Sequence, residues 1–357
     1  MFTNPELAEL AERGAIFPGA VDWMRLDAGG SPLAEDAQPT LSTTPNSGIP
    51  AFLTTIVDPN IIEVLFSPNK AAKILGEVKK GDWLTDTALF PMVEFTGEVS
   101  SYGDYATNGS AGVNTDFPNR QSYHYQIIKQ YGEREMERAG LARIAWAAAL
   151  DRAAILTLNK YQNLTYFFGV SGLMNYGLTN DPRLPASLTP SGKAAGGVTW
   201  FTTGGAPNAT ANEVYNDIIT IYNNLVVNAG GNVEIEMENP LVLSMSPQLQ
   251  VALTFTNTYG VTVRKMLETS YPKMRFETAV QFGALSATNP QGFAAGNMVY
   301  LVAENVGGQD TGYCAFTEKL RNHRIVMDMS SFKQKSTQGS FGAVIRQPFA
   351  ISNMVGC

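Results

Sequence analysis

The sequence has few of the residues from which most active sites are built. Among its 357 residues are two histidines, His124 and His323, and two cysteines, Cys314 and Cys357. Neither histidine has a neighbour at HExxH or HxH spacing, and the two cysteines allow at most one disulfide and no CxxC pair. Nothing in the spacing supports a nucleophile and base pair between Cys314 and a histidine. Phosphate-binding glycine loops of the GxxxxGK(S/T) and GxGxxG types are also missing.

Charge is scarce as well. Charged residues make up 16% of the chain, against about 25% in typical soluble proteins. Because a folded monomer needs surface charge to stay soluble, the deficit indicates that partners cover much of the surface. A formal net charge of −7 argues against broad binding of nucleic acid, which requires clustered Lys and Arg.

Targeting signals are missing too. No apolar run reaches the roughly 18 residues that would span a membrane. The N-terminus carries acidic residues where a signal peptide needs a basic region. We therefore expect a protein that is made, and acts, in a reducing cytoplasm.

The longest regular pattern runs from Glu133 to Phe168. It has no proline, and its one internal glycine costs only about 1 kcal/mol relative to alanine. The pattern predicts one helix of roughly 45 Å, which is either a core helix or a spine that other subunits cross. Two apolar sets at helical spacing predict that two faces are covered. The first is Met136, Ala139, Trp146, Leu150, Ala154, Tyr161 and Leu164, and the second is Leu141, Ile144, Ala148 and Ile155.

The N-terminal region reads as an arm. A short amphipathic helix is expected from Asn4 to Gly14, with Leu7 and Leu10 on one side. Residues 17–50 are rich in Pro, Gly, Ser and Thr and show no periodicity. A stretch of that kind is uncommon inside a compact domain, so it is either disordered or ordered against another surface.

A hairpin is expected between residues 81 and 131. Alternation at Val93 and Phe95, and again at Tyr123, Tyr125 and Ile127, predicts two strands of an antiparallel pair. The residues between them, SSYGDYATNGSAGVNTDFPNR, predict a long loop. A two-stranded hairpin has too little core to stand alone in water. It must lie on its own body or on a neighbouring chain.

The second half mixes helices and strands without regular alternation, which predicts the α+β class. Helices are expected from the capping box of Thr210 and Glu213 to Gly230, from Ser246 to about Phe255, and from Thr262 to Tyr271. Strands are expected at 241–243, 298–303, 313–316, 324–329 and 341–352.

Paired carboxylates offer one enzymatic hypothesis. Glu234 and Glu236 alternate in VEIEME and would share one face of a strand, as a general acid and base do. Solvated carboxylates on a strand are much commoner than catalytic ones. We expect no catalytic, cofactor or metal residue.

The order of elements and several local stretches resemble the major capsid protein of tailed bacteriophages, of the HK-ninety-seven type. The similarity covers nearly the whole chain and rests on pattern, since no catalytic motif anchors it. The stretches that carry it are GDWLTDTALFP (81–91), LARIAWAAALDRAA (141–154), YGLTNDPRLP (176–185), SPQLQVAL (246–253) and GSFGAVIRQPFAI (339–351).

This resemblance implies a division of the chain. It implies an N-terminal arm, a peripheral domain with the spine helix at about 133–168, an extended hairpin (E-loop), an axial domain that meets its copies around five- and six-fold axes, and return strands to the peripheral domain. The corresponding residues are 1–55 for the arm, 56–80 and 128–235 for the peripheral domain, 81–127 for the hairpin, 236–320 for the axial domain and 321–357 for the return strands.

The resemblance also implies partners. Pentamers and hexamers of the chain would form an icosahedral shell around double-stranded DNA, without sequence-specific binding, in a virion assembled in a host bacterial cytoplasm. The resemblance implies portal and decoration proteins as partners, and either a separate scaffolding protein or none. It implies no membrane and no cofactor. The segments expected to make assembly contacts carry Leu7, Leu10, Phe95, Tyr102, Phe117 and Tyr123, and Trp146, Leu150 and Tyr161 are expected to pack the spine helix.

Three alternatives stay open at this point. An encapsulin shell resembles the same fold but encloses cargo enzymes. A carboxylate-dependent enzyme, for example one that acts on glycans, would use Glu234 and Glu236. A tail or baseplate protein would form rings or tubes.

Overall fold

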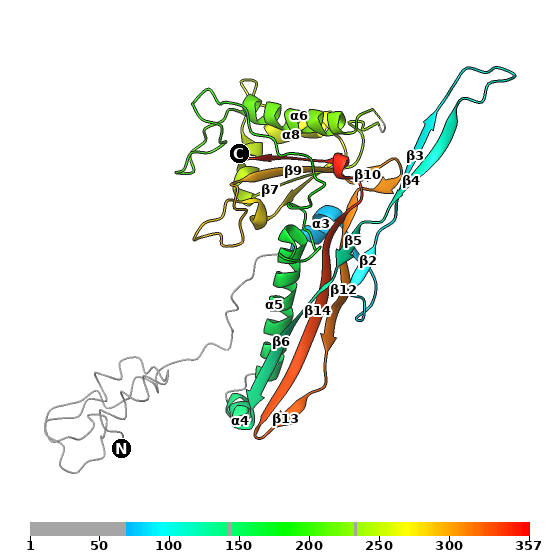
Figure 1. The fold of residues 1–357 in the computed structure, drawn as a ribbon. Helices are drawn as coiled ribbons and strands as arrows, with labels where there is room; N and C mark the ends of the chain where they lie inside the picture. Colours follow the sequence, from blue (N-terminus) through cyan, green and yellow to red (C-terminus); the bar gives the residue numbers. More distant parts are fainter. Residues whose placement is uncertain (1–68, 142–144, 232–233) are drawn as a thin grey trace, which may run out of the picture. The chain divides into compact units, whose positions relative to one another are not determined.

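A computed structural model describes residues 69–141, 145–231 and 234–357 (Figure 1). The chain divides into two units, and every described residue belongs to the second, Phe66–Cys357. The predicted N-terminal helix and arm, with Leu7 and Leu10, lie outside the described residues.

Five strands form the first sheet, in the order β1, β12, β14, β13, with β6 also paired to β14 (Figure 1). Strand β1 runs parallel to β12, and all other neighbours are antiparallel. β14 is the longest strand and joins β6, β12 and β13 into one sheet. The bounds are β1 Glu77–Lys79, β6 Tyr123–Gly132, β12 Gly312–Asn322, β13 Val326–Asp328 and β14 Ser331–Ile345.

The final β-segment differs from the predicted 341–352. Strand β14 begins at Ser331. Its first ten residues, SFKQKSTQGS, were not predicted as a strand because they are polar and show no apolar alternation. The strand stops at Ile345, and the 3-10 turn η4 (Pro348–Ala350) separates it from β15 (Ile351–Val355). Proline has no N–H to donate to a strand ladder, which explains the break.

Helix α5 (Trp146–Phe168) packs across β14 and β6 of this sheet. The prediction of one uninterrupted helix from Glu133 is wrong. Helix α4 (Glu133–Leu141) is separate, and Ala145 has a ψ of 69°, outside the helical region. The 23 residues of α5 span roughly 35 Å. Helix propensity is a weak prior that tertiary packing overrides. Here α5 buries one face against the sheet, whereas α4 has no buried residue.

The predicted hairpin is present, but its strands pair differently. Strand β3 (Met92–Glu98) pairs with β4 (Ser110–Asp116), which lies inside the predicted loop. The run from Tyr123 is β6, which pairs with β14 of the body. A short ribbon of β2 (Thr87–Leu89) and β5 (Asn119–Gln121) forms the hairpin base.

The second sheet has the order β15, β9, β7, β8. Strand β9 alternates between two cores: Val299 and Leu301 face one, and Tyr300 and Val302 face the other. The first core includes residues of two helices, 211–228 and 263–270, and the second contains Phe167 of α5. A sheet buried on both faces reads as a continuous apolar run, as MVYLVA does. The bounds are β7 Leu241–Met245, β8 Met274–Thr278 and β9 Met298–Ala303.

The helices of this half confirm the predicted caps. Helix α6 (Ala211–Asn228) begins at a capping box in which Thr210 accepts from the Glu213 N–H and Glu213 accepts from the Thr210 N–H. The predicted helix from Ser246 is the short α7 (Pro247–Gln250) followed by η2 (Val251–Thr254). Thr262 caps α8 (Val263–Ser270). The remaining elements are α3 (Ala71–Leu75), β10 (Asn305–Val306), β11 (Gln309–Asp310) and η3 (Val280–Phe282).

Three segments pack with other elements than the domain bounds implied by the resemblance would suggest. Helix α6 packs on the second sheet, although residues 128–235 were grouped with the spine helix. Strand β12 belongs to the first sheet, although 236–320 were grouped together. Strand β15 pairs with β9 and does not return to the first sheet. Strand identity is a local property of the sequence, whereas strand partnership is set by long-range contacts.

Candidate assembly surfaces

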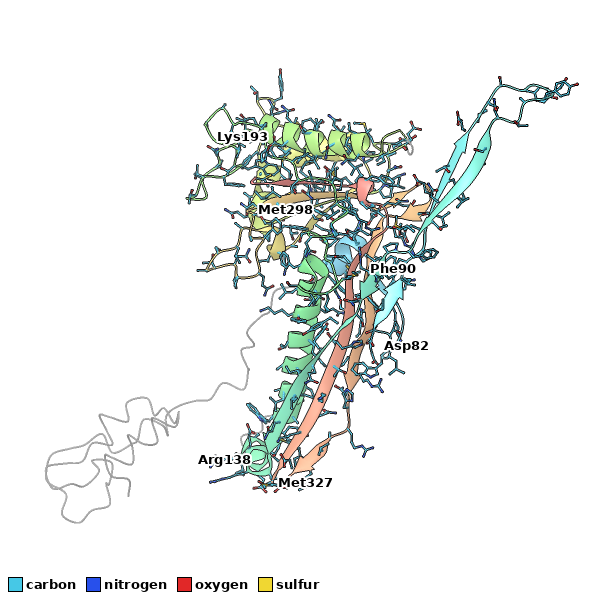
Figure 2. All side chains as sticks on the ribbon, viewed as in Figure 1. Asp82, Phe90, Arg138, Lys193, Met298 and Met327 are labelled. Carbon is cyan, nitrogen blue, oxygen red and sulfur yellow. The ribbon has the colours of Figure 1, made fainter. Side chains whose placement is uncertain are left out.

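The β3–β4 hairpin leaves its apolar side chains uncovered. Within the described residues its two strands pair only with each other. Phe95 is 84% exposed, Tyr102 is 92% exposed and Tyr105 is 99% exposed. The side chains of the hairpin stand clear of both sheets (Figure 2). Burying one such side chain is worth about 1.5–3 kcal/mol, so the single chain leaves much of this stabilisation unrealised.

The predicted contact residues fall into two groups. Phe95 lies on β3, Tyr102 lies in the connection between β3 and β4, and Phe117, which follows β4, is also exposed. Tyr123 differs, since it lies on β6 with its ring centroid 6.3 Å from that of Tyr161 on α5. The structure therefore places Tyr123 with the spine-helix residues. Contact with another copy stays a prediction for all of them.

The hairpin base is anchored by a buried ion pair. The Nη2 of Arg120 on β5 lies 2.6 Å from Oδ2 of Asp181, and their side chains are 6% and 0% exposed. Burial lowers the pKa of the Arg120 guanidinium, and the Asp181 carboxylate opposes that effect. Arg183 adds two contacts, since its Nη2 donates to the Ile345 carbonyl and its Nη1 lies 3.1 Å from Sδ of Met92. Sequence reasoning missed this anchor, although TNDPR contains both Asp181 and Arg183.

The spine-helix residues are less buried than the pattern indicated. Trp146 and Leu150 are half-buried near the start of α5, and Tyr161 packs its ring 4.6 Å from that of Tyr125. The fully buried face instead includes Leu158 and Phe167. On the second predicted face Leu141 is 87% exposed and Ile155 is 38% exposed, so among the described residues that face is only partly covered.

A polar seam joins α5 to the first sheet. Gln338 of β14 donates to Oδ1 of Asn159 at 3.0 Å and accepts from the Tyr125 hydroxyl at 2.9 Å. Thr165 donates to Oγ of Ser340 at 3.1 Å. The seam explains why the polar half of β14 can be buried, because each amide or hydroxyl there has a partner.

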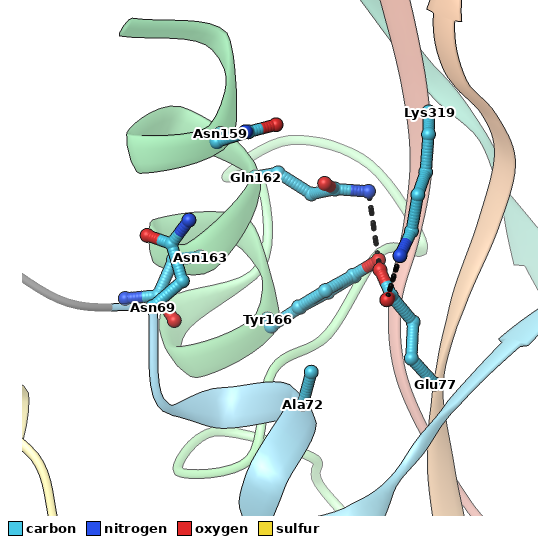
Figure 3. A pocket seen from close by; sticks show the side chains of 8 residues that line it. All are labelled: Asn69, Ala72, Glu77, Asn159, Gln162, Asn163, Tyr166 and Lys319. Atoms are coloured by element: carbon cyan, nitrogen blue, oxygen red, sulfur yellow. Dashed lines mark hydrogen bonds and ion pairs between the residues drawn. The ribbon is translucent and has the colours of Figure 1, made fainter. Parts of the chain in front are cut away.

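A small polar cavity of about 210 Å³ opens beside this seam (Figure 3). Glu77 accepts from the Tyr166 hydroxyl at 2.7 Å and pairs with Lys319, and Gln162 donates to the Tyr166 oxygen at 2.8 Å. Burial, together with the negative charge of Glu77, raises the pKa of Tyr166, so the phenol stays neutral and donates. Since the carboxylate is already engaged by two donors, the cavity offers no free general base. The lining residues are Asn69, Ala72, Glu77, Asn159, Gln162, Asn163, Tyr166 and Lys319.

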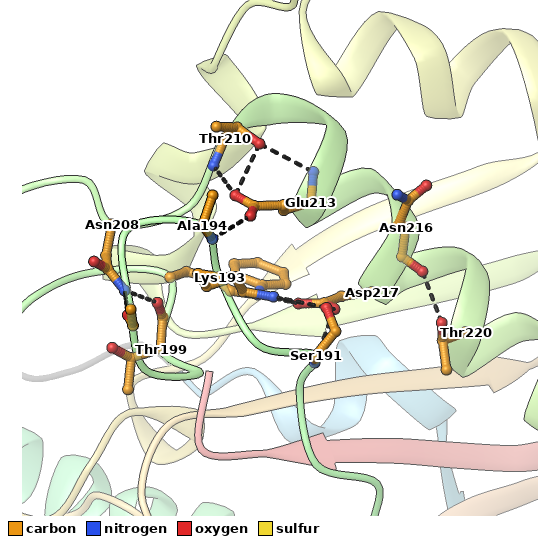
Figure 4. A network of polar contacts seen from close by, with 12 residues as sticks. Ser191, Lys193, Ala194, Thr199, Asn208, Thr210, Glu213, Asn216, Asp217 and Thr220 are labelled. Atoms are coloured by element: carbon orange, nitrogen blue, oxygen red, sulfur yellow. Dashed lines mark hydrogen bonds and ion pairs between the residues drawn. The ribbon is translucent and has the colours of Figure 1, made fainter.

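A second buried network holds the 191–200 loop against α6 (Figure 4). Lys193 Nζ lies 2.5 Å from Oδ2 of Asp217, and both side chains are at most 1% exposed. Asp217 also accepts from Nε1 of Trp200 at 2.8 Å and from the Ser191 hydroxyl at 2.6 Å. Every charge in the network has a partner, so its chemistry is that of a structural clasp.

The candidate catalytic residues do not form a site. Glu234 and Glu236 lie outside any strand and are exposed, so the predicted alternating face does not form. Burial raises the pKa of the Cys314 thiol, which keeps it a poor nucleophile. Both cysteines are buried and free. Among the described residues no group of His, Cys, Asp and Glu is arranged to hold a metal ion.

None of the helices in the described ranges combines the length and the apolar character needed to cross a bilayer.

The fold is of the HK-ninety-seven-like α+β type and is similar to that of several solved capsid chains. The capsid of Myoviridae phage XM1 is similar with a TM-score of 0.66 and 14% identity, over 87% of this chain and 99% of that one. The capsid of a native GTA particle has a TM-score of 0.56 and 12% identity, over 84% and 94%. A Mycobacterium phage Cain chain has a TM-score of 0.54 and 9% identity, over 88% and 98%.

The family follows from the sequence itself. Residues 40–356 match the model of the family described as Pa193 gp26 major capsid protein, and the chain belongs to that family. A comparison with curated proteins found no significant match. The protein is thus a structural, shell-forming component of a tailed-phage virion and not an enzyme. The predicted class, fold and non-enzymatic role are confirmed, and the carboxylate-enzyme hypothesis is wrong.

Proposed function

We propose that copies of this chain form the pentamers and hexamers of an icosahedral shell, and that the β3–β4 hairpin of each copy is covered by a neighbouring copy. The exposed hairpin carries this proposal. Among the residues that the structure describes, no third strand pairs with β3 or β4, and Phe95, Tyr102 and Tyr105 are almost fully exposed. An isolated two-stranded hairpin is marginal in water, so a surface on another copy supplies the missing cover.

We further propose that the shell encloses double-stranded DNA without reading its sequence. The net charge of −7 supports containment without tight, broad phosphate binding. Assembly would take place in the host bacterial cytoplasm with portal and, where present, scaffolding and decoration proteins. Residues 1–55 would serve as an arm, and the second sheet with its helices, which holds most of the predicted axial segment 236–320, would lie at the symmetry axes.

The test replaces the exposed aromatics of the hairpin. A Phe95→Ser, Tyr102→Ser, Tyr105→Ser variant is compared with wild type by electron microscopy of purified assemblies. Because these side chains contact little in the single chain, subunit stability is expected to change by less than about 0.5 kcal/mol per site. Closed shells are expected to be lost or greatly reduced.

The matched control is Asn108→Ser, a polar change in the same hairpin, which should leave shells intact. If the triple variant forms shells of normal number and size, the hairpin is not an assembly contact and the proposal fails. Pelleting of shells with and without nuclease treatment, followed by extraction, measures the enclosed DNA.

A further inference from the structure

Trp83 gathers the only two histidines of the chain. The imidazole of His124 packs edge-on to the indole at a centroid distance of 4.8 Å, and that of His323 does so at 5.9 Å. The guanidinium carbon of Arg321 lies 5.3 Å from the same indole. Three side chains that carry, or can take up, positive charge therefore share one aromatic ring. We call Trp83, His124, Arg321 and His323 the Trp83 cluster.

The cluster lies on the face of the first sheet that α5 does not cover. Tyr123 and Tyr125 on β6 both contact Tyr161 of α5. His124 stands between them on the strand, and side chains alternate between faces along a strand, so His124 points away from α5. Trp83 belongs to the turn between β1 and β2, and its ring fastens this turn to β6 and β12.

The packing under the cluster is tight. A Cβ at Gly339 of β14 would lie 2.1 Å from Oγ1 of Thr317 and 2.8 Å from Cδ2 of His124, so only glycine fits. His124 Nε2 lies 3.4 Å from Oγ1 of Thr317, and His323 Nε2 lies 3.1 Å from Oγ1 of Thr337. A hydroxyl both donates and accepts, so each partner suits the neutral and the charged imidazole alike.

The fastened turn is continuous with the hairpin base. Ser122, just before β6, donates its N–H to the Asp86 carbonyl at 2.8 Å and its hydroxyl to the Thr85 carbonyl at 2.7 Å. The turn leads directly into β2, and β2 leads into β3 of the hairpin. Loss of the Trp83 contact would therefore free the start of the hairpin base.

We propose that the Trp83 cluster is a pH-sensitive fastening of the hairpin base. Histidine changes charge between about pH 8 and 5. Protonation of both imidazoles puts three cations around one indole, which has only two faces for cation–π contact. Repulsion among these close charges then outweighs the ring attraction.

The neighbouring charges compensate only in part. Glu318 on β12 pairs with Arg321 at 3.7 Å, and Asp82 beside Trp83 pairs with Lys79 at 3.7 Å. Lys335 of β14 adds a further positive charge next to His323, whose N–H donates to the Lys335 carbonyl. Acid therefore loosens the turn at residues 81–86. The Arg120 and Asp181 ion pair is separate from the cluster and still holds β5. The inference concerns the subunit and does not depend on shell geometry.

The test measures amide hydrogen exchange of the full-length chain by mass spectrometry at pH 7.5 and pH 5.5, with each rate corrected for intrinsic exchange. Protection of peptides within 81–91 is expected to fall about tenfold at the lower pH. Protection of β9, at 298–303, serves as the internal reference and should not change. The tryptophan fluorescence spectrum of wild type minus that of Trp83→Phe isolates the emission of Trp83. The wavelength of this emission should shift over the same pH range.

The variants decide the cause. In His124→Gln with His323→Gln the pH response of 81–91 is expected to disappear, and in Arg321→Gln it should be at least halved. A response that persists in the double variant, or no response in wild type, overturns the proposal. If the double variant does not fold, Arg321→Gln decides alone, because its side chain is 45% exposed and removal leaves the strand intact. An unchanged response there also overturns the proposal.

Discussion

Arg120 of β5 and Asp181, which follows α5 by thirteen positions in the chain, meet in a buried ion pair 2.6 Å long. The Arg120 guanidinium also lies 4.8 Å from the ring of Tyr176. This charge pair therefore connects the hairpin base to the loop that contains Leu178, a residue of the second hydrophobic core. The exposed hairpin therefore extends from a firmly held base.

Asp181→Asn is expected to lower the free energy of unfolding by about 3–5 kcal/mol, because Arg120 is left buried without its counter-ion. Denaturant unfolding at pH 7 measures the change. Glu268→Gln, which breaks the exposed pair of Arg264 and Glu268, is the control and should cost less than about 0.5 kcal/mol. Equal effects of the two changes would contradict the burial of the first pair.

The clasp on α6 should show strong coupling. Lys193→Met leaves Asp217 charged in a dry site and is expected to cost about 3–5 kcal/mol, and Asp217→Leu should cost a similar amount. The double variant is expected to cost much less than the sum, because no uncompensated charge remains. A double-mutant cycle by denaturant unfolding measures this coupling. Strict additivity would show that the two groups do not interact.

Gln338→Leu should disrupt the polar seam. The change removes the partner of the half-buried Tyr125 hydroxyl and of the half-buried Asn159 side-chain oxygen, and each lost hydrogen bond is worth about 0.5–1.5 kcal/mol. Gln126→Leu on the exposed face of β6 is the matched control, with an effect within about 0.5 kcal/mol. Thermal unfolding compares them. If Gln338→Leu were neutral, the seam would tolerate an apolar side chain and its hydrogen bonds would not matter for stability.

The buried thiols predict a loss of stability in alkali. Burial raises the pKa of both Cys314 and Cys357 above the unfolded value of about 8.5. The unfolded chain therefore loses thiol protons first, and stability falls as the pH rises above about 8.5. Unfolding measured at pH 7, 9 and 10 should show this slope, and Cys314→Ala should reduce it. Native thiols that react with a thiol reagent as fast as unfolded ones would exclude this explanation.

Two aromatic residues of α5 should differ in their contribution. Phe167 is completely buried, so Phe167→Ala is expected to cost about 3–5 kcal/mol. Trp146 is half-buried, and Trp146→Ala should cost less than half as much. Denaturant midpoints rank the two changes. A larger loss at Trp146 than at Phe167 would mean that the start of α5 carries the packing, as the sequence pattern alone indicated.

Local signals located most elements of the second half. The capping box at Thr210, the Ser246-Pro247 start and the apolar run of β9 each act through near neighbours in the chain, so their outcome can be predicted without knowing the fold. The exposed Phe95 and Tyr102 were also within reach, since a hairpin with apolar residues and no core has nowhere of its own to bury them.

Long-range contacts could not be read in the same way. The polar start of β14 is a strand because it pairs with β6, β12 and β13. Nothing near Gln338 in the chain shows these pairings or the hydrogen bond from Gln338 to Asn159 of α5. The Trp83 cluster joins residues some 40 to 240 positions apart. The pairing of β3 with β4, and of β15 with β9, likewise depends on which edges remain free after other strands have paired.

The sequence by itself determined the class of protein through its resemblance to a known family. It also determined the positions of the capped helices and the existence of a hairpin without a core of its own, because these follow from interactions within a few residues. Tertiary structure alone decided where the long helix breaks, which strands share a sheet and which charges are buried together. Those outcomes depend on the desolvation and packing of groups that are distant in the chain, and their free energies exist only once the fold has formed.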